Sequence, residues 1–214
     1  MRTLIYSDVH GNLPAFEKML KAEEKYESYV CLGDLVNYGP WSNECVELAN
    51  SLPSSTLLMG NHEEAFINGH YPGENALVKE FFSLTYQDFN ALEEIKKFKE
   101  ETILNNFVCR HTILDKYIYP DTDIELTYDS IIGHSHHQFE YKHNGYVLYN
   151  AGSVGQNRKF IDVINYLIYD WDKKSITMKA MPYDIKPLIH EMKNRGYSDN
   201  CIAYYESKKR ANLT

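Results

Sequence analysis

The chain has 214 residues, of which 43% are hydrophobic and 24% charged, and its formal net charge is −8. This length and composition are typical of a soluble globular protein, and we expect a single domain over residues 1–214. The negative charge argues against a nucleic acid polymer as a partner, because phosphate backbones are bound mainly through clustered lysine and arginine. A bound cation can reverse the sign locally, so nucleotides and small phosphoesters are not excluded.

Targeting and membrane segments are not apparent in the sequence. The N-terminus enters a strand-like run at once, without the basic and apolar segments of a signal peptide. No apolar stretch approaches the length that spans a membrane. The four cysteines are widely spaced, and Cys31 and Cys109 lie in apolar runs, so we expect small core residues rather than disulfides or a zinc knuckle. We therefore expect a cytoplasmic protein that does not bind membranes; the sequence does not indicate an oligomeric state.

The first apolar run, residues 2–6, predicts a strand that is followed by Asp8 and His10. Residues two apart in an extended backbone point to the same side, so this carboxylate and imidazole suit a divalent transition metal. A plain turn is the alternative for the pair, and we favour the metal. Asn12 comes just before a predicted helix that contains Pro14, Phe16 and Met19. Capping of that helix is the favoured role of Asn12, and contact with a substrate is the alternative.

Two further strands, residues 29–32 and 56–59, end in polar groups of the same kind. Gly33 allows a sharp turn that exposes Asp34, although Gly-Asp is also a common turn dipeptide. The third strand leads into Gly60-Asn61-His62-Glu63, in which Asn61 offers an amide oxygen and His62 a proton near neutral pH. The alternation of strands and helices predicts right-handed parallel crossovers, which would bring these groups to one edge of a sheet.

Residues 63 to about 100 show helical spacing and carry no chemistry that we assign; His70 reads as a surface residue. A strand over residues 105–110 ends at His111, and residues 112–127 are irregular and acidic. A strand at residues 130–132 then leads into Gly133-His134-Ser135-His136. The two histidines, two residues apart, share one side, and His137 would face away.

The remaining residues predict two hairpins, a loop and a helix. Asn144-Gly145 indicates one hairpin, and residues 161–170 and 175–181 indicate another. The glycine-rich stretch 152–155 and Arg158 can bind a phosphate through backbone N–H groups and a bidentate guanidinium. A tight turn with an ordinary surface arginine is the alternative. Residues 185–192 predict a helix that ends at Gly196, with His190 on its surface.

Five short motifs with metal-ligand residue types occur in a fixed order along the chain. They are Asp8-Val9-His10-Gly11-Asn12, Gly33-Asp34, Gly60-Asn61-His62-Glu63, His111 and Gly133-His134-Ser135-His136. With these motifs the sequence resembles the calcineurin-like metallophosphoesterase family, most of all its small bacterial phosphodiesterase branch, from Arg2 to about Asp170. It departs from the family pattern at four positions: Asn37 stands where many members have an acidic residue, Thr112 where glycine is usual, and Ala151 and Asn157 where prolines are expected.

The resemblance implies an α/β fold, a four-layer α/β/β/α sandwich of two mixed sheets with two metal ions at the strand ends. It assigns one metal to Asp8, His10, Asp34 and His136. The other is assigned to Asn61, His111 and His134 together with Asp34, whose carboxylate bridges both.

The implied reaction is in-line attack on a small phosphodiester or phosphomonoester by a hydroxide that bridges the metals. His62 remains outside the ligand set and can stabilise charge or protonate the leaving oxygen. The mixed N and O ligands suit Mn, Fe, Zn, Ni or Co. Asn61 and Arg158, with Asn12 as the alternative above, are the residues expected to contact the substrate. A dinucleoside-polyphosphate hydrolase is the first alternative function, and a non-catalytic metal-binding scaffold is the second.

Overall fold

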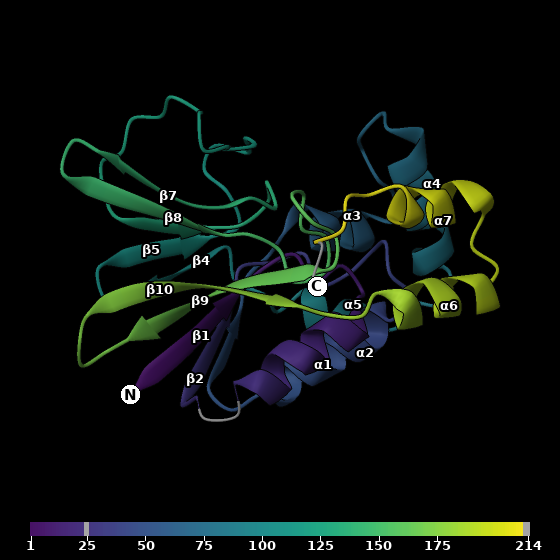
Figure 1. The fold of residues 1–214 in the computed structure, drawn as a ribbon, viewed down its shortest axis with the longest axis horizontal. Coiled ribbons are helices and arrows are strands. Elements are labelled where there is room, and N and C mark those ends of the chain that lie inside the picture. Colours follow the sequence, from purple (N-terminus) through teal and green to yellow (C-terminus); the bar gives the residue numbers. More distant parts are fainter. Residues whose placement is uncertain (24–25, 212–214) are drawn as a thin grey trace.

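The N-terminal part of the chain forms the predicted β-α-β-α-β unit. The computed structural model describes residues 1–23 and 26–211. Three parallel strands lie side by side in the order β1-β2-β3, and two antiparallel strands extend the sheet to β10-β9-β1-β2-β3 (Figure 1). The elements of this sheet and its crossovers are β1 (Arg2–Tyr6), α1 (Leu13–Ala22), β2 (Ser28–Cys31), α2 (Ser42–Ser51), β3 (Ser55–Leu57), β9 (Val163–Asp170) and β10 (Ser175–Pro182).

A second five-stranded sheet has the order β4-β5-β6-β8-β7 and mixes parallel with antiparallel pairs. The predicted hairpin at Asn144-Gly145 joins β7 to β8, and both turn residues have positive φ. The hairpin of β4 and β5 was not predicted; its two connecting residues are Asn105 and Asn106. The strands are β4 (Glu101–Leu104), β5 (Phe107–Arg110), β6 (Ser130–Ile132), β7 (Gln138–His143) and β8 (Tyr146–Ala151).

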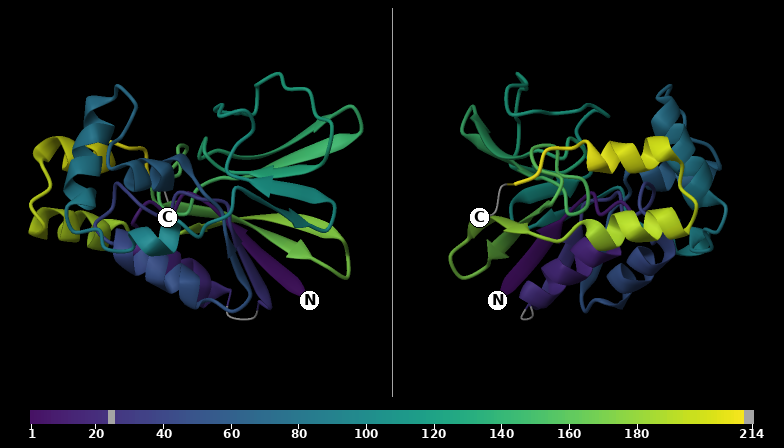
Figure 2. Two further views of the ribbon diagram at one scale, coloured as in Figure 1. Left: turned by 180° about the vertical axis from the view of Figure 1, so that it is seen from behind. Right: turned by 45° about the vertical axis from the view of Figure 1, so that its right-hand side comes forward.

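The two sheets pack face to face (Figure 2). A shared layer of apolar side chains lies between them. In β1 the side chains alternate, so Ile5 enters this layer while Leu4 and Tyr6 face the helices on the opposite side. Cys31 and Cys109 are buried with free thiols, as expected of small core residues. The strand ends are therefore held by packing on both faces, which fixes the loops that follow them.

The outer layers of the sandwich differ. Helices α1 and α2 cover the first sheet, whereas the irregular segment 112–128 packs on the second. Ile118 and Leu126 of that segment are buried against Phe139 and Leu148. The predicted α/β sandwich of two mixed sheets is confirmed, with this segment as the cover of its second sheet.

The remaining helices gather toward the carboxyl ends of the parallel strands (Figures 1 and 2). They are α3 (Asn61–Asn68), α4 (Ala76–Tyr86), α5 (Leu92–Ile95), α6 (Lys186–Asn194) and α7 (Asp199–Glu206). Helix α6 was predicted, whereas α7, which begins after the N-cap Ser198, was not. Among the described residues, the helices are all too short or too polar to cross a bilayer.

Candidate metal centre

Loops at the carboxyl ends of five strands bring the predicted ligand residues together. Two overlapping groups of potential metal ligands result, and they share Asp34. We name them the Asp8 group (Asp8, His10, Asp34 and His136) and the His111 group (Asp34, Asn61, His111 and His134). All but Asn61 are buried. The convergence follows from the sheets: strands that run parallel end at the same edge, so ligands from β1, β2, β3, β5 and β6 meet there.

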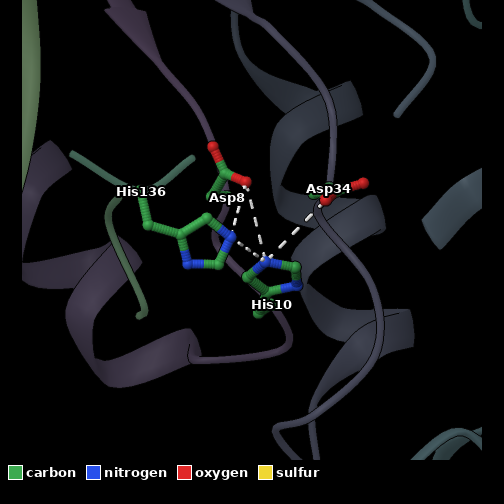
Figure 3. A group of neighbouring side chains, drawn as sticks. All are labelled: Asp8, His10, Asp34 and His136. Carbon is green, nitrogen blue, oxygen red and sulfur yellow. Dashed lines mark hydrogen bonds and ion pairs between the residues drawn. The ribbon is translucent and has the colours of Figure 1, made fainter. Parts of the chain in front are cut away.

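The Asp8 group has a compact arrangement of donor atoms (Figure 3). His136 Nε2 lies 3.1 Å from Asp8 Oδ1 and 3.2 Å from His10 Nε2. His10 Nε2 also lies 3.7 Å from Asp8 Oδ1 and 3.8 Å from Asp34 Oδ2. Side chains from three separate loops thus point at one small volume.

The His111 group continues from the same oxygen of Asp34. His111 Nε2 lies 3.3 Å from Asp34 Oδ2, 3.1 Å from Asn61 Oδ1 and 3.1 Å from His134 Nδ1. Asp34 Oδ1, by contrast, accepts a hydrogen bond from the backbone N–H of His62 at 3.0 Å. One carboxylate oxygen is therefore fixed by the backbone while the other faces both groups.

The hydrogen bonds of the imidazoles show that a cation fits between these atoms. Three rings approach backbone carbonyls through Nδ1: His10 at Val36 O (3.2 Å), His111 at Leu32 O (2.9 Å) and His136 at Gln156 O (2.9 Å). A carbonyl only accepts, so each neutral ring carries its proton on Nδ1 and a lone pair on Nε2. The Nε2 lone pairs of His10 and His136 then face one another, and Asp8 Oδ1 is buried without a hydrogen-bond partner. Converging lone pairs of this kind suit a metal ion.

Burial and the charges in the site favour the protonation states in which most of these groups can bind a metal. Burial raises the pKa of Asp34, but the neighbouring His111 and His62 outweigh it and hold that pKa well below its ordinary value. Burial lowers the pKa of His134 and of His136 to about 4. His111 differs: burial lowers its pKa, yet the charge of Asp34 raises it to about 10, so a cation would compete with a proton there. Ionised carboxylates and neutral imidazoles bind metals without first releasing protons.

The backbone at the ligands is unusual and is held by contacts between loops. Five ligand residues have φ between 51° and 66°, a region that residues other than glycine rarely adopt: Asp8, His10, Asp34, His134 and His136. The N–H groups of Asp8 and His10 donate to the carbonyls of Gly33 and Asp34, each at 3.0 Å. At Gly133 the constraint is steric and does not concern φ. A Cβ at this position would lie 2.7 Å from Asp8 Oδ2, which is too close for a side chain.

Glu63 organises the loop that carries Asp34, a role that the sequence analysis missed. Its buried carboxylate accepts four backbone hydrogen bonds, at 2.7–3.2 Å, from residues 34, 35, 36 and 60. Burial and the charge of Asp34 raise the pKa of Glu63 to about 7. The four N–H donors require an acceptor on every side, so the ionised form fits this cradle. The available signal was Glu63 three residues after Gly60, the spacing of a helix capping box.

His62 lies in the first turn of helix α3, beside both groups but in neither. Its Nε2 lies 4.0 Å from Asp34 Oδ2, and its Nδ1 lies 2.8 Å from Asn37 Nδ2. The ring of Tyr71 stacks on it, with centroids 5.6 Å apart and planes 20° apart. Burial lowers the pKa of His62 to about 3 despite the nearby Asp34. His62 is thus a neutral, oriented ring at the edge of the centre.

The residues expected to contact a substrate lie in different surroundings. Asn12 is fully buried: its Oδ1 accepts from Ala15 N at the start of α1, and its Nδ2 donates to Gly155 O and Tyr183 Oη. Its amide is thus used within the fold, as in the favoured capping role, and leaves no donor for a substrate. Arg158 is exposed, and its guanidinium donates to Tyr204 Oη.

His70, His137 and His190 also lie outside the two ligand groups. His70 and His190 are exposed, and His137 Nδ1 lies 2.7 Å from Ser135 O. These positions agree with the expectation that they are surface or outward-facing residues. A cavity of about 280 Å³ borders the His111 group, and Asn61, His111 and His134 lie in its wall.

Comparison with known proteins identifies the family. The model of the calcineurin-like phosphoesterase family matches residues 1–174. The uncharacterized protein MJ0912 of Methanocaldococcus jannaschii is 29% identical over an alignment of 224 positions, gaps included. The alignment covers 89% of this chain and 92% of that protein.

Two solved structures resemble the whole chain. A metallophosphoesterase from Sphaerobacter thermophilus superposes with a TM-score of 0.81 and 25% identity, covering 97% of this chain and 99% of the other. The hypothetical protein PH1004 from Pyrococcus horikoshii OT3 shares the fold, with a TM-score of 0.78, 13% identity and 99% of each chain covered. The chain, whose match to the family model spans all the ligand residues, belongs to the calcineurin-like phosphoesterase family.

Proposed function

We propose that the protein is a phosphodiesterase that holds two divalent metal ions and hydrolyses a small phosphoester. The observation that carries this proposal is the shared Oδ2 of Asp34, which faces His10 at 3.8 Å and His111 at 3.3 Å. A single carboxylate oxygen between two sets of lone pairs suits a pair of cations. The Asp8 group would hold one of them and the His111 group the other. Their nitrogen and oxygen donors suit Mn, Fe, Zn, Ni or Co.

The residues in and around the two groups have different roles in the proposed reaction. Bound metal ions supply charge neutralisation at the phosphoryl oxygens and a hydroxide from water at neutral pH. Asn61 borders the cavity and contributes an amide oxygen there. His62, outside both groups, presents Nε2 toward the reacting phosphoryl group. Arg158 offers its guanidinium to a phosphoryl oxygen of the substrate.

The test compares bis-p-nitrophenyl phosphate with p-nitrophenyl phosphate. Protein stripped with a chelator is assayed with Mn, Ni, Co, Zn or Mg added back. We expect metal-restored cleavage of the diester, and His62→Ala should lower kcat at least about 100-fold, the lower end of the range for general acid–base groups, while metal content is retained. His70→Ala, which removes an exposed histidine from the loop after α3, is the matched control and should leave kcat unchanged.

Other outcomes would redirect the proposal. Cleavage of the monoester alone would indicate a phosphatase. Metal binding without cleavage of either ester would call for dinucleoside polyphosphates as the next substrates. Failure there as well would favour the non-catalytic scaffold.

A further inference from the structure

The amide of Asn37 has a fixed orientation. This residue lies in the loop after β2, buried, with φ 73°. Its Oδ1 lies 2.7 Å from the backbone N of Tyr38, and the hydroxyl of Thr85 in α4 lies 3.2 Å from the same oxygen. A backbone N–H can only donate, so the amide atom that meets it must be the oxygen. The amide nitrogen is therefore the atom that faces His62.

This orientation determines where the ring of His62 carries its proton. Asn37 Nδ2 lies 2.8 Å from His62 Nδ1. Because an amide nitrogen only donates, Nδ1 must accept, and the neutral ring bears its proton on Nε2. A second proton on Nδ1 would set two N–H groups against each other in a site where His62 is 5% exposed. The stacked ring of Tyr71 keeps Nε2 directed toward Asp34.

We propose that Asn37 holds His62 as a neutral hydrogen-bond donor, and that the enzyme favours substrates whose leaving oxygen departs as a stable anion. The phosphate of a phosphoanhydride and an aryloxide are such leaving groups, whereas a simple alkoxide is not. The proposal rests on the phosphodiesterase function above and specifies the leaving group that suits this site.

The bond changes show why the leaving group matters. A bond forms between phosphorus and a hydroxide derived from water, while the bond from phosphorus to the leaving oxygen breaks and its electron pair stays on that oxygen. His62 Nε2–H donates a hydrogen bond to this oxygen but keeps its proton, because loss of the proton would leave an anionic ring. The oxygen takes a proton from solvent after it departs. A leaving group that is unstable as an anion gains little from this arrangement.

The first part of the test locates the ring proton without any assay of activity. Histidine-¹⁵N NMR of the zinc-loaded, diamagnetic protein distinguishes the two tautomers, and His62→Gln assigns the signal. We expect the Nε2–H tautomer in the wild type. Asn37→Asp should place a proton on Nδ1, because a carboxylate accepts where the amide donated. A proton on Nδ1 in the wild type would overturn the proposal.

The second part compares methyl p-nitrophenyl phosphate with methyl phenyl phosphate, which differ only in the stability of the leaving anion. We expect the ratio of their kcat values to fall at least tenfold in Asn37→Asp, since a ring backed by a carboxylate can give up a proton and keep another. Asn50→Asp adds the same charge at an exposed position of α2 and should keep the wild-type ratio.

An unchanged ratio in Asn37→Asp would overturn the leaving-group preference. If wild-type protein cleaved neither ester, the proposed phosphodiesterase function would fail and the preference with it. The NMR result would still decide how His62 is held.

Discussion

The two ligand groups share one carboxylate, yet they meet solvent differently. Asp8 and His10 are fully buried, and both rings of the Asp8 group are oriented by backbone carbonyls. In the His111 group, Asn61 and both histidines line the cavity of about 280 Å³. The ring of His134 lies under Tyr117 at 4.0 Å between centroids, and Tyr117 is itself 53% exposed. The Asp8 group is thus enclosed in the core, whereas the His111 group borders a cavity.

The difference originates in the layers of the fold. Two members of the Asp8 group, Asp8 and His10, follow β1, a central strand of the first sheet with helices on its outer face. His111 and His134 follow β5 and β6, and the outer face of their sheet is covered by the irregular segment 112–128. A cover without regular hydrogen bonding leaves room for a cavity, and loops of this kind commonly form ligand sites. If the two groups hold cations as proposed, we expect the Asp8 group to retain its cation and the His111 group to exchange cations and to meet substrate.

The largest effect is expected from Asp34→Asn, because it affects both groups at once. We expect kcat/KM for the diester to fall at least about 1000-fold, about 4 kcal/mol of transition-state stabilisation at about 1.4 kcal/mol per tenfold. Metal content, measured by mass spectrometry of the purified protein, should fall as well. Asp121→Asn changes an exposed carboxylate and is the control. Full metal content in Asp34→Asn would contradict the shared role.

The positions of the ligand residues could be predicted because a local rule places them. Each follows an apolar strand, and parallel strands end at one edge, so short motifs such as Asp8-x-His10 are enough to bring distant side chains together. The parallel β-α-β-α-β unit and the hairpin at Asn144-Gly145 were predictable for the same reason, since periodicity and turn chemistry are local. The roles of these residues in metal binding and catalysis remain predictions.

The groups that orient the ligands follow no local rule. Asn37 meets Thr85 across 48 positions of the chain, and Arg158 meets Tyr204 across 46. Neither Thr85 nor Tyr204 lies in a motif, and such contacts depend on how α4 and α7 pack. The β4–β5 hairpin was missed because Asn105-Asn106 is a weaker turn signal than Asn-Gly. Local pattern therefore predicted the ligand residues, while tertiary packing determines the contacts that tune them.

The contrast in exposure also predicts two rates of metal loss. When EDTA is added to zinc-loaded protein, a zinc indicator should report two phases of equal size whose rates differ at least about tenfold, the ratio that a difference of about 1.4 kcal/mol in barrier produces. The fast phase would come from the His111 group, because it borders the cavity. His134→Ala should abolish the fast phase, whereas His136→Ala should remove the slow one. A single phase in the wild type would show that the two groups are equally accessible.

The smallest effect is expected from Tyr204→Phe, which tests whether α7 supports substrate binding beside the Asp8 group. The hydroxyl of Tyr204 accepts from Arg158 and donates to Gln156 Oε1 at 3.0 Å, and the backbone carbonyl of Gln156 lies 2.9 Å from His136 Nδ1. Loss of one hydrogen bond costs about 0.5–1.5 kcal/mol, so KM for the diester should rise about threefold while kcat stays unchanged.

Two comparisons separate this role of Tyr204 from a general loss of packing. In an Arg158→Ala background Tyr204→Phe should add nothing, because the guanidinium that it orients is gone. Tyr146→Phe, the same change on an exposed tyrosine of β8, should leave KM unaltered. If instead Tyr204→Phe lowered kcat and left KM unchanged, its hydroxyl would act through Gln156 on His136. The position of a ligand residue in the Asp8 group would then depend on α7. The group would be coupled to a helix at the surface even though its own side chains are buried.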